Sequence, residues 1–283
     1  MKKRDLPAVA ASGRPGMECR ISDKVQARWN PDVRAAGDDA PASTISILDP
    51  IGESFFSEGV TAKRISAALR AIGGKDVVVN INSPGGDFFE GLAIYNLLRE
   101  YDGQVTVRVL GLAASAASVI AMAGDTVHIG RAAFLMIHNT WVMAAGDRHA
   151  FREVADWLAP FDQAAVSIYA ARTGMDARAL AKMCDDETWI GGEKAVDQGF
   201  ADGLLESDAV ENAAQNSKGV SPMAAEKLLD LALAAGRQIP RTERRNLVAA
   251  LKGGKPGAAL TGTPGAAEIE AIAAGALQKL KTL

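Results

Sequence analysis

Histidine and cysteine are scarce in this chain of 283 residues, which contains three histidines and two cysteines. Cys19 and Cys184 are too few for a scaffold held together by disulfides, and their neighbourhoods lack the paired spacing of metal ligands. We therefore expect two free thiols in a reducing compartment, no metal and no other cofactor.

Long apolar runs are also missing, and so is a strong excess of either charge. No stretch approaches the roughly 18 apolar residues of a membrane span. Residues 7–17 are small and punctuated by glycine and proline, unlike the apolar core of a signal peptide. The net charge of −3 gives no reason to expect a polyanionic partner. We expect a cytoplasmic protein that binds neither membranes nor nucleic acid.

Composition divides the chain into three parts. Residues 1–43 are broken repeatedly by proline and glycine, which predicts a flexible, irregular arm with a short ordered piece near residues 19–29. Residues 44–206 alternate between β-branched runs and helical patterns and are expected to form one domain. Residues 207–283 are rich in alanine and glycine, and we expect a linker followed by a partly helical extension.

The alternation within the middle part predicts an α/β fold with a largely parallel sheet. A tight turn is expected at residues 111–114, and Pro160 is expected to interrupt or bend a long helical segment. The expected strands cover residues 44–48, 76–81, 104–110, 126–129 and 133–137, and the expected helices cover 61–72, 88–101, 115–123, 148–172, 177–183 and 191–199.

Ser115 lies just past an expected strand, at the start of an expected helix, among the small residues GLAASA (111–116). A serine attacks a carbonyl only if a base removes its proton and hydrogen-bond donors hold the developing oxyanion. The free amides of a helix N-terminus, first of all that of Ala116, are suitable donors. The simpler interpretation is a serine that caps the helix. Ser118, one turn deeper, is expected to be a packing residue.

A second turn, INSPGG (81–86), follows an expected buried strand. Gly85 and Gly86 expose backbone amides where no side chain blocks access, although an ordinary loop can carry the same residues. Ligands bind at the carboxyl ends of parallel strands, so we expect this turn and Ser115 to face the same edge of the sheet.

His138 directly follows the apolar residues 134–137, at a strand end where catalytic groups leave a sheet. A histidine in this place can also simply bond to a loop. The two other histidines fit other roles, because His128 lies within an expected strand and His149 lies among charged residues at a helix start. His138 is thus the candidate general base.

An acidic cluster, Asp185, Asp186 and Glu187, precedes the apolar residues 188–190. A serine–histidine pair needs a carboxylate that orients the imidazole and stabilises its cation. Such a cluster is usually a solvated loop, but its position makes one member a candidate for the orienting acid.

Taken together, INSPGG (81–86), GLAASA (111–116) and MIH (136–138) resemble, in content and order, the three signature blocks of ClpP-type serine peptidases. The resemblance covers residues 43–205. It implies a β/α spiral of the ClpP/crotonase-like superfold, stacked rings that enclose the active sites, and a handle helix at residues 148–172.

The resemblance also implies roles for individual residues. Ser115 becomes the nucleophile and His138 the base of a serine endopeptidase, and the amides of Gly86 and Ala116 form the oxyanion hole. We further expect Gly85 and Asn139 to contact the substrate.

The third member of the triad is where the sequence departs from the family pattern. By register against Trp189, the family's aspartate falls on Glu187, with the neighbouring Asp186 as its competitor. Glutamate can orient a catalytic histidine, so we favour Glu187.

Residues 86–95 (GDFFEGLAIY) and 121–125 (AMAGD), with the long C-terminal part, resemble the phage and prophage branch of the family. Its head-maturation proteases trim capsid or scaffold proteins, and our protein would then act in the host cytoplasm or inside a phage prohead. The partners implied are protein or peptide substrates and further copies of the chain. Whether an ATPase unfoldase is used stays open, and so does the role of the tail, either a scaffold-like or self-cleaved segment or a plain appendage.

Two other functions compete with the peptidase. An acyl-CoA enzyme of the crotonase type would share the superfold and the two-amide oxyanion hole, but it needs no serine–histidine pair. A scaffold component with a vestigial site would account for the low-complexity tail, but the intact blocks argue against it.

Overall fold

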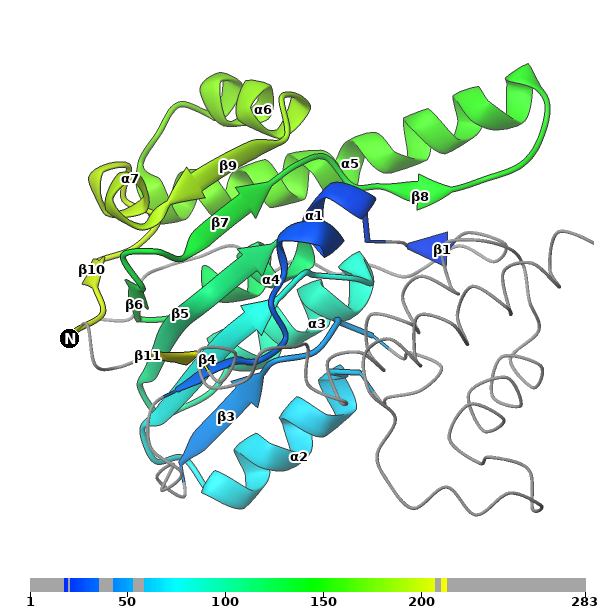
Figure 1. Cartoon of the computed structure of the whole chain (residues 1–283). Helices are drawn as coiled ribbons and strands as arrows, with labels where there is room; N and C mark the ends of the chain where they lie inside the picture. Colours follow the sequence, from blue (N-terminus) through cyan, green and yellow to red (C-terminus); the bar gives the residue numbers. More distant parts are fainter. Residues whose placement is uncertain (1–17, 20, 36–42, 53–58, 207–209, 213–283) are drawn as a thin grey trace, which may run out of the picture.

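The computed structural model describes residues 18–19, 21–35, 43–52, 59–206 and 210–212. The expected C-terminal helical patches and most of the expected N-terminal arm lie outside these residues. Within the described part, the residues form one central sheet with helices packed against it (Figure 1).

The core of the sheet consists of parallel strands, in the order β10-β6-β5-β4-β3. β4 is buried almost throughout, as expected for a central parallel strand covered on both faces. The strands are β3 (Thr44–Ile47), β4 (Val77–Ser83), β5 (Val105–Ala114), β6 (Thr126–Ile129) and β10 (Gly203–Leu204).

The tight turn expected at residues 111–114 is wrong, because β5 continues as a strand to Ala114. The strand changes partners instead of turning: its last residues pair with β7 (Phe134–Ile137), which pairs antiparallel with β9 (Thr188–Gly191). The small residues in the last part of β5 let neighbouring chain segments pack closely against it. A Cβ on Gly111 would lie 2.9 Å from the Asn82 side-chain oxygen, which accepts a hydrogen bond from the Leu112 amide.

The helices begin at the capping residues that the sequence supplies. Thr61 caps α2 (Ala62–Ile72) and Asp87 caps α3 (Phe88–Arg99) by accepting bonds from first-turn amides. The shorter helices are α4 (Ala116–Ala121), α6 (Ala177–Asp185) and α7 (Gly192–Asp197).

The longest helix, α5 (Arg148–Thr173), runs through Pro160 without a break, so the expected interruption is wrong. Pro160 is exposed, and the helix loses only the hydrogen bond that a proline cannot donate. The second half of α5 buries Ala165, Ile168 and Tyr169, whereas its first half extends beyond the sheet (Figure 1).

The ordered piece expected near residues 19–29 is the helix α1 (Asp23–Arg28). Val25 and Trp29 pack against Leu112, Ala114 and Met136 in a small cluster of their own, on β5 and β7. Four short strands form two further pairs: β1 (Glu18–Cys19) pairs with β8 (Val142–Met143), and β2 (Val33–Ala35) pairs with β11 (Val210–Asn212). Among the helices described here, none has the length and apolar character needed to cross a membrane.

Candidate active site

Ser115 lies at the junction between β5 and α4 with an unusual backbone, at φ 54° and ψ −125°. Its amide donates to the Met136 carbonyl (2.9 Å), and its carbonyl accepts from the Ser118 hydroxyl (2.6 Å). Within the described part of the chain, the Ser115 side chain caps no helix amide. The Ser115 hydroxyl therefore does not cap the helix, so the simpler, non-catalytic interpretation of this serine does not hold.

The hydroxyl of Ser115 instead meets His138, whose Nε2 lies 2.7 Å from Ser115 Oγ. Burial lowers the pKa of His138, and the negative charge of Glu187 opposes that shift. A lowered pKa keeps the imidazole neutral at pH 7, and only neutral Nε2 can take a proton from serine.

The turn after β4 approaches the same junction. Gly85 and Gly86 have φ values of +84° and +147°, which side-chain-bearing residues rarely adopt. A Cβ on Gly85 would lie 2.5 Å from the Ala114 carbonyl oxygen, and one on Gly86 would lie 2.2 Å from the Ile51 oxygen. The two turns meet at one edge of the sheet, as expected, and glycine is what lets them approach.

The three acidic candidates separate in space. Asp186 pairs with Lys182 on the surface, and Asp185 accepts a bond from the Asn139 side chain. Glu187 is the one whose charge acts on His138, and it also lies 3.5 Å from Lys24 of α1.

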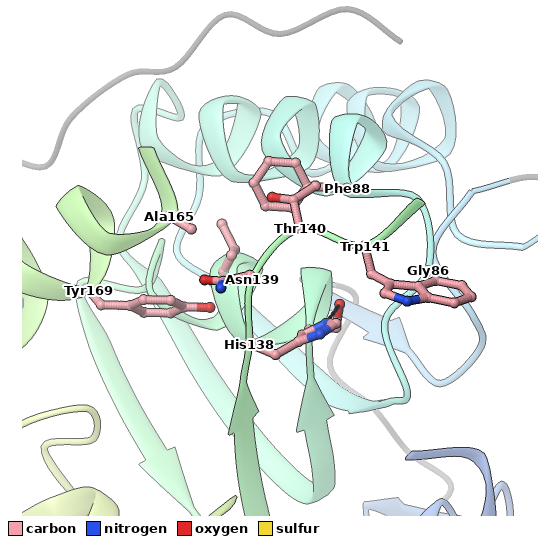
Figure 2. A pocket seen from close by; sticks show the side chains of 10 residues that line it. Gly86, Phe88, His138, Asn139, Thr140, Trp141, Ala165 and Tyr169 are labelled. Carbon is pink, nitrogen blue, oxygen red and sulfur yellow. Dashed lines mark hydrogen bonds between the residues drawn. The ribbon is translucent and has the colours of Figure 1, made fainter. Parts of the chain in front are cut away.

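A small pocket, open to solvent, lies beside the pair, and Figure 2 shows side chains converging on it. Its walls combine the two catalytic candidates with aromatic and aliphatic groups from α3, α4 and α5. The lining residues are Gly86, Phe88, Ser115, Val119, His138, Asn139, Thr140, Trp141, Ala165 and Tyr169.

With this geometry in place, comparison with known proteins decides the family. The family model for Clp protease matches residues 43–208, more than half of the chain. The chain belongs to the Clp protease family. The serine–histidine contact thus occurs in a ClpP-like α/β domain, and the family supports a protease.

Individual Clp relatives agree with this assignment. ATP-dependent Clp protease proteolytic subunit 1 of Chlamydia muridarum is 31% identical over 171 residues, which cover 53% of this chain and 84% of the relative. The proteolytic subunit of Ligilactobacillus salivarius is 32% identical over 138 residues, covering 47% and 68%. Subunit 3 of Rhodococcus jostii is 30% identical over 139 residues, covering 48% and 68%.

Several residues that shape this Clp-type site were not anticipated from sequence. Ala165 and Tyr169 of α5 were read only as part of a helix, although their spacing of four places them on one face. Ser118 is more than a packing residue, because its hydroxyl lies 2.8 Å from that of Tyr169. No local pattern marks Thr140 or Trp141, which reach the pocket from the loop after β7.

Proposed function

We propose that the chain is a serine endopeptidase in which Ser115 is the nucleophile and His138 the general base. The 2.7 Å contact between His138 Nε2 and Ser115 Oγ carries the proposal. As Ser115 Oγ attacks the peptide carbonyl, its proton passes to Nε2, and His138 then delivers that proton to the leaving amine. An acyl-CoA enzyme has no use for this pair.

The amides of Ala116 and Gly86 are the proposed oxyanion donors. Ala116 is the first residue of α4, where helix amides lack partners within the helix. Gly86 belongs to the turn that meets this junction, and its missing side chain lets the Ile51 backbone pack directly against that turn. Donors placed beforehand stabilise the charge that develops on the carbonyl oxygen.

Glu187 is the proposed third member of the triad, in preference to Asp186. Its carboxylate raises the pKa of His138, which is the effect that an orienting acid has on the imidazolium. Asp186 is exposed and engaged with Lys182.

Gly85 and Asn139 are the proposed substrate contacts: Asn139 lines the pocket, and Gly85 directly precedes the lining residue Gly86. Phe88, Val119 and Ala165 give the pocket an apolar part beside its polar lining, and this part favours substrates with an apolar side chain next to the scissile bond. We assign this activity to a domain at residues 44–206, flanked by an arm (1–43) and an extension (207–283).

The finer biological setting is also part of the proposal. A homo-oligomeric ring, or stacked rings, in the cytoplasm is supported by family membership and by the exposed first half of α5. A role in phage head maturation, with capsid or scaffold substrates, is supported by the resemblance of residues 86–95 and 121–125 to that branch. The relatives named above are subunits of ATP-dependent proteases, which supports an ATPase unfoldase as a partner. The alternative is that this chain hydrolyses peptides without an ATPase.

Labelling with a fluorophosphonate, followed by intact-mass measurement, tests the activity. We expect one adduct per chain on Ser115, none in Ser115→Ala, and strongly reduced labelling in His138→Ala. A folded wild-type oligomer that remains unlabelled and cleaves no peptide would refute the proposal. In that case, measurable binding of a CoA thioester would favour the acyl-CoA enzyme.

The same mass spectrum tests the self-processing expected for a head-maturation protease. Cleavage within residues 212–222 in wild type, absent in Ser115→Ala, would support it. An uncleaved tail in an active enzyme would leave a peptidase without this step.

A further inference from the structure

One face of α5 reaches towards both members of the Ser115–His138 pair. Asp162, Ala165 and Tyr169 recur on it at intervals of three and four residues. Ala165 and Tyr169 project towards the pocket (Figure 2). Asp162 and Tyr169 are two turns apart, about 10 Å along the axis, and each contacts a different catalytic segment.

Tyr169 connects α5 to the nucleophile. Its hydroxyl lies 2.8 Å from the Ser118 hydroxyl, and Ser118 donates its proton to the Ser115 carbonyl at 2.6 Å. Since a hydroxyl carries one proton, Tyr169 must donate to Ser118. These two consecutive buried hydrogen bonds hold the Ser115 backbone at φ 54°. Such a conformation persists only when its surroundings impose it.

Asp162 connects α5 to the base. β7 ends at Ile137, so sheet pairing holds the chain on the N-terminal side of His138 but not on its C-terminal side. On the other side, the Thr140 amide donates to Asp162 Oδ1 at 2.6 Å. The Asn139 side chain bonds to Asp185, which is exposed and therefore a weaker anchor.

The surroundings of Asp162 make its carboxylate costly to keep charged. Burial raises the pKa of Asp162 and the nearby charge of Asp185 adds to that shift, while the hydrogen bond from Thr140 opposes it. Burial raises the pKa of the Cys184 thiol, and the charge of Asp162 adds to that shift. A half-buried acid that still engages a loop amide is expected where the loop must be held still.

We propose that Asp162 and Tyr169 are positioning residues, which hold His138 and Ser115 at hydrogen-bond distance from a single helix face. The inference rests on the proposed peptidase function but concerns how this chain assembles its site. It makes α5 a rigid spacer between the two catalytic segments.

Two readouts test the proposal on the full chain. The first is the second-order rate constant for fluorophosphonate labelling of Ser115. The second is the pH titration of the His138 ring by NMR of histidine-labelled protein, which needs no activity and has only two other histidines to resolve. Thermal unfolding is measured alongside.

We expect Asp162→Ala to lower the labelling rate at least tenfold and to move the His138 pKa up towards its ordinary value of about 6.5 as the ring gains water. Asp162→Asn keeps an oxygen that accepts from Thr140 and should restore most of the rate. Tyr169→Phe should slow labelling several-fold with little change in the His138 titration. Gln163→Ala, an exposed position on the second half of the same helix, is the matched control and should behave as wild type.

If Asp162→Ala does not fold, Asp162→Leu replaces it, because Leu fills a similar volume without accepting a hydrogen bond. Unchanged labelling and an unchanged His138 titration in either variant would overturn the proposal. The proposal would also be overturned if Asp162→Asn and Asp162→Ala lost labelling rate equally and in proportion to their loss of melting temperature. If wild type neither labels nor cleaves, yet the His138 titration moves as expected, the peptidase function fails and the positioning role stands.

Discussion

Ser115 and Glu187 share an uncommon backbone. Among the described residues they are the non-glycine residues with positive φ, at 54° and 49°. Such conformations cost roughly 1–3 kcal/mol each and gather at functional sites. Ser115 points its hydroxyl at His138, and Glu187 acts on the same imidazole from the start of β9. The shared strain favours Glu187 over Asp186 as the acid, independently of register.

Glu187→Gln should lower kcat/KM by about 10²–10⁴-fold, because the imidazolium loses its stabilising charge. Glu187 raises the pKa of His138, so its removal lowers that pKa and shifts the acidic limb of the kcat/KM profile to lower pH. The pH dependence of peptide cleavage measures both effects. Asp186→Asn is the matched control, and a larger loss in this variant would reverse the assignment.

Gly85→Ala should damage both stability and activity. The new Cβ would meet the Ala114 oxygen at 2.5 Å and the Ser115 Cβ at 2.8 Å, in a backbone with φ +84°. Gly74→Ala provides the control: φ is +76°, but nothing lies within 4 Å, so it should lose only the ~1–2 kcal/mol of backbone strain. Denaturant unfolding should show a larger loss of stability in Gly85→Ala than in Gly74→Ala. Only Gly85→Ala should slow the labelling of Ser115.

At the scale of elements, β5 and α1 determine how the site is supported. β5 pairs with β4 and β6 along its first part and then with β7, which brings the Ser115 and His138 strand ends together. α1 covers this second part from outside the main core through Val25 and Trp29. It also contacts the site region directly, through Lys24 to Glu187 and through Arg28 stacked over Trp189.

Trp29→Ala should therefore destabilise the domain and slow Ser115 labelling. The side chain is 4% exposed, and its indole donates to the Asn82 carbonyl at 3.0 Å. Truncating a buried tryptophan costs about 3–5 kcal/mol, and the carbonyl loses its partner. Gln26→Ala on the same helix should stay within about 0.5 kcal/mol of wild type. Urea unfolding measures the difference, and equal midpoints would contradict the role of α1.

At the scale of the whole molecule, the exposed half of α5 is the feature that a single chain leaves unexplained. It carries Phe151, 51% exposed, and extends past the sheet next to β8 (Figure 1). Large apolar side chains that project into water are typical of association surfaces. This agrees with the proposed ring assembly.

Phe151→Asp should weaken self-association at least tenfold without unfolding the domain. A charge placed in an apolar contact would have to be desolvated on assembly, whereas in the free chain it stays in water. Light scattering across a concentration series gives the mass, and circular dichroism checks the fold. An unchanged oligomer in Phe151→Asp would place the contact elsewhere.

Local patterns in the sequence were enough to predict much of the architecture and to single out Ser115 and His138, whose side chains are in contact. β-branched runs, capping residues and glycine stops depend on near neighbours, so the helices of residues 44–206 and the strands β3 to β7 could be placed within a few positions, whereas β8, β9 and β10 were not predicted. Ser115, His138 and the Gly85-Gly86 turn stood out because strand ends in a parallel sheet gather at one edge. The turn expected at residues 111–114 and the interruption expected at Pro160 were wrong because tertiary pairing or solvent exposure outweighed local preference, whereas a bend at Pro160 stays a prediction.

Only the tertiary structure decided which carboxylates act where. Asp162, Asp185, Asp186 and Glu187 have similar chemistry, and what distinguishes them is the group that each one faces: a loop amide, an asparagine, a surface lysine or the His138 imidazole. Those partners are distant in sequence or lie on other elements, so local pattern carries little information about them. The sequence determines that a serine and a histidine can meet, whereas packing determines what holds them together.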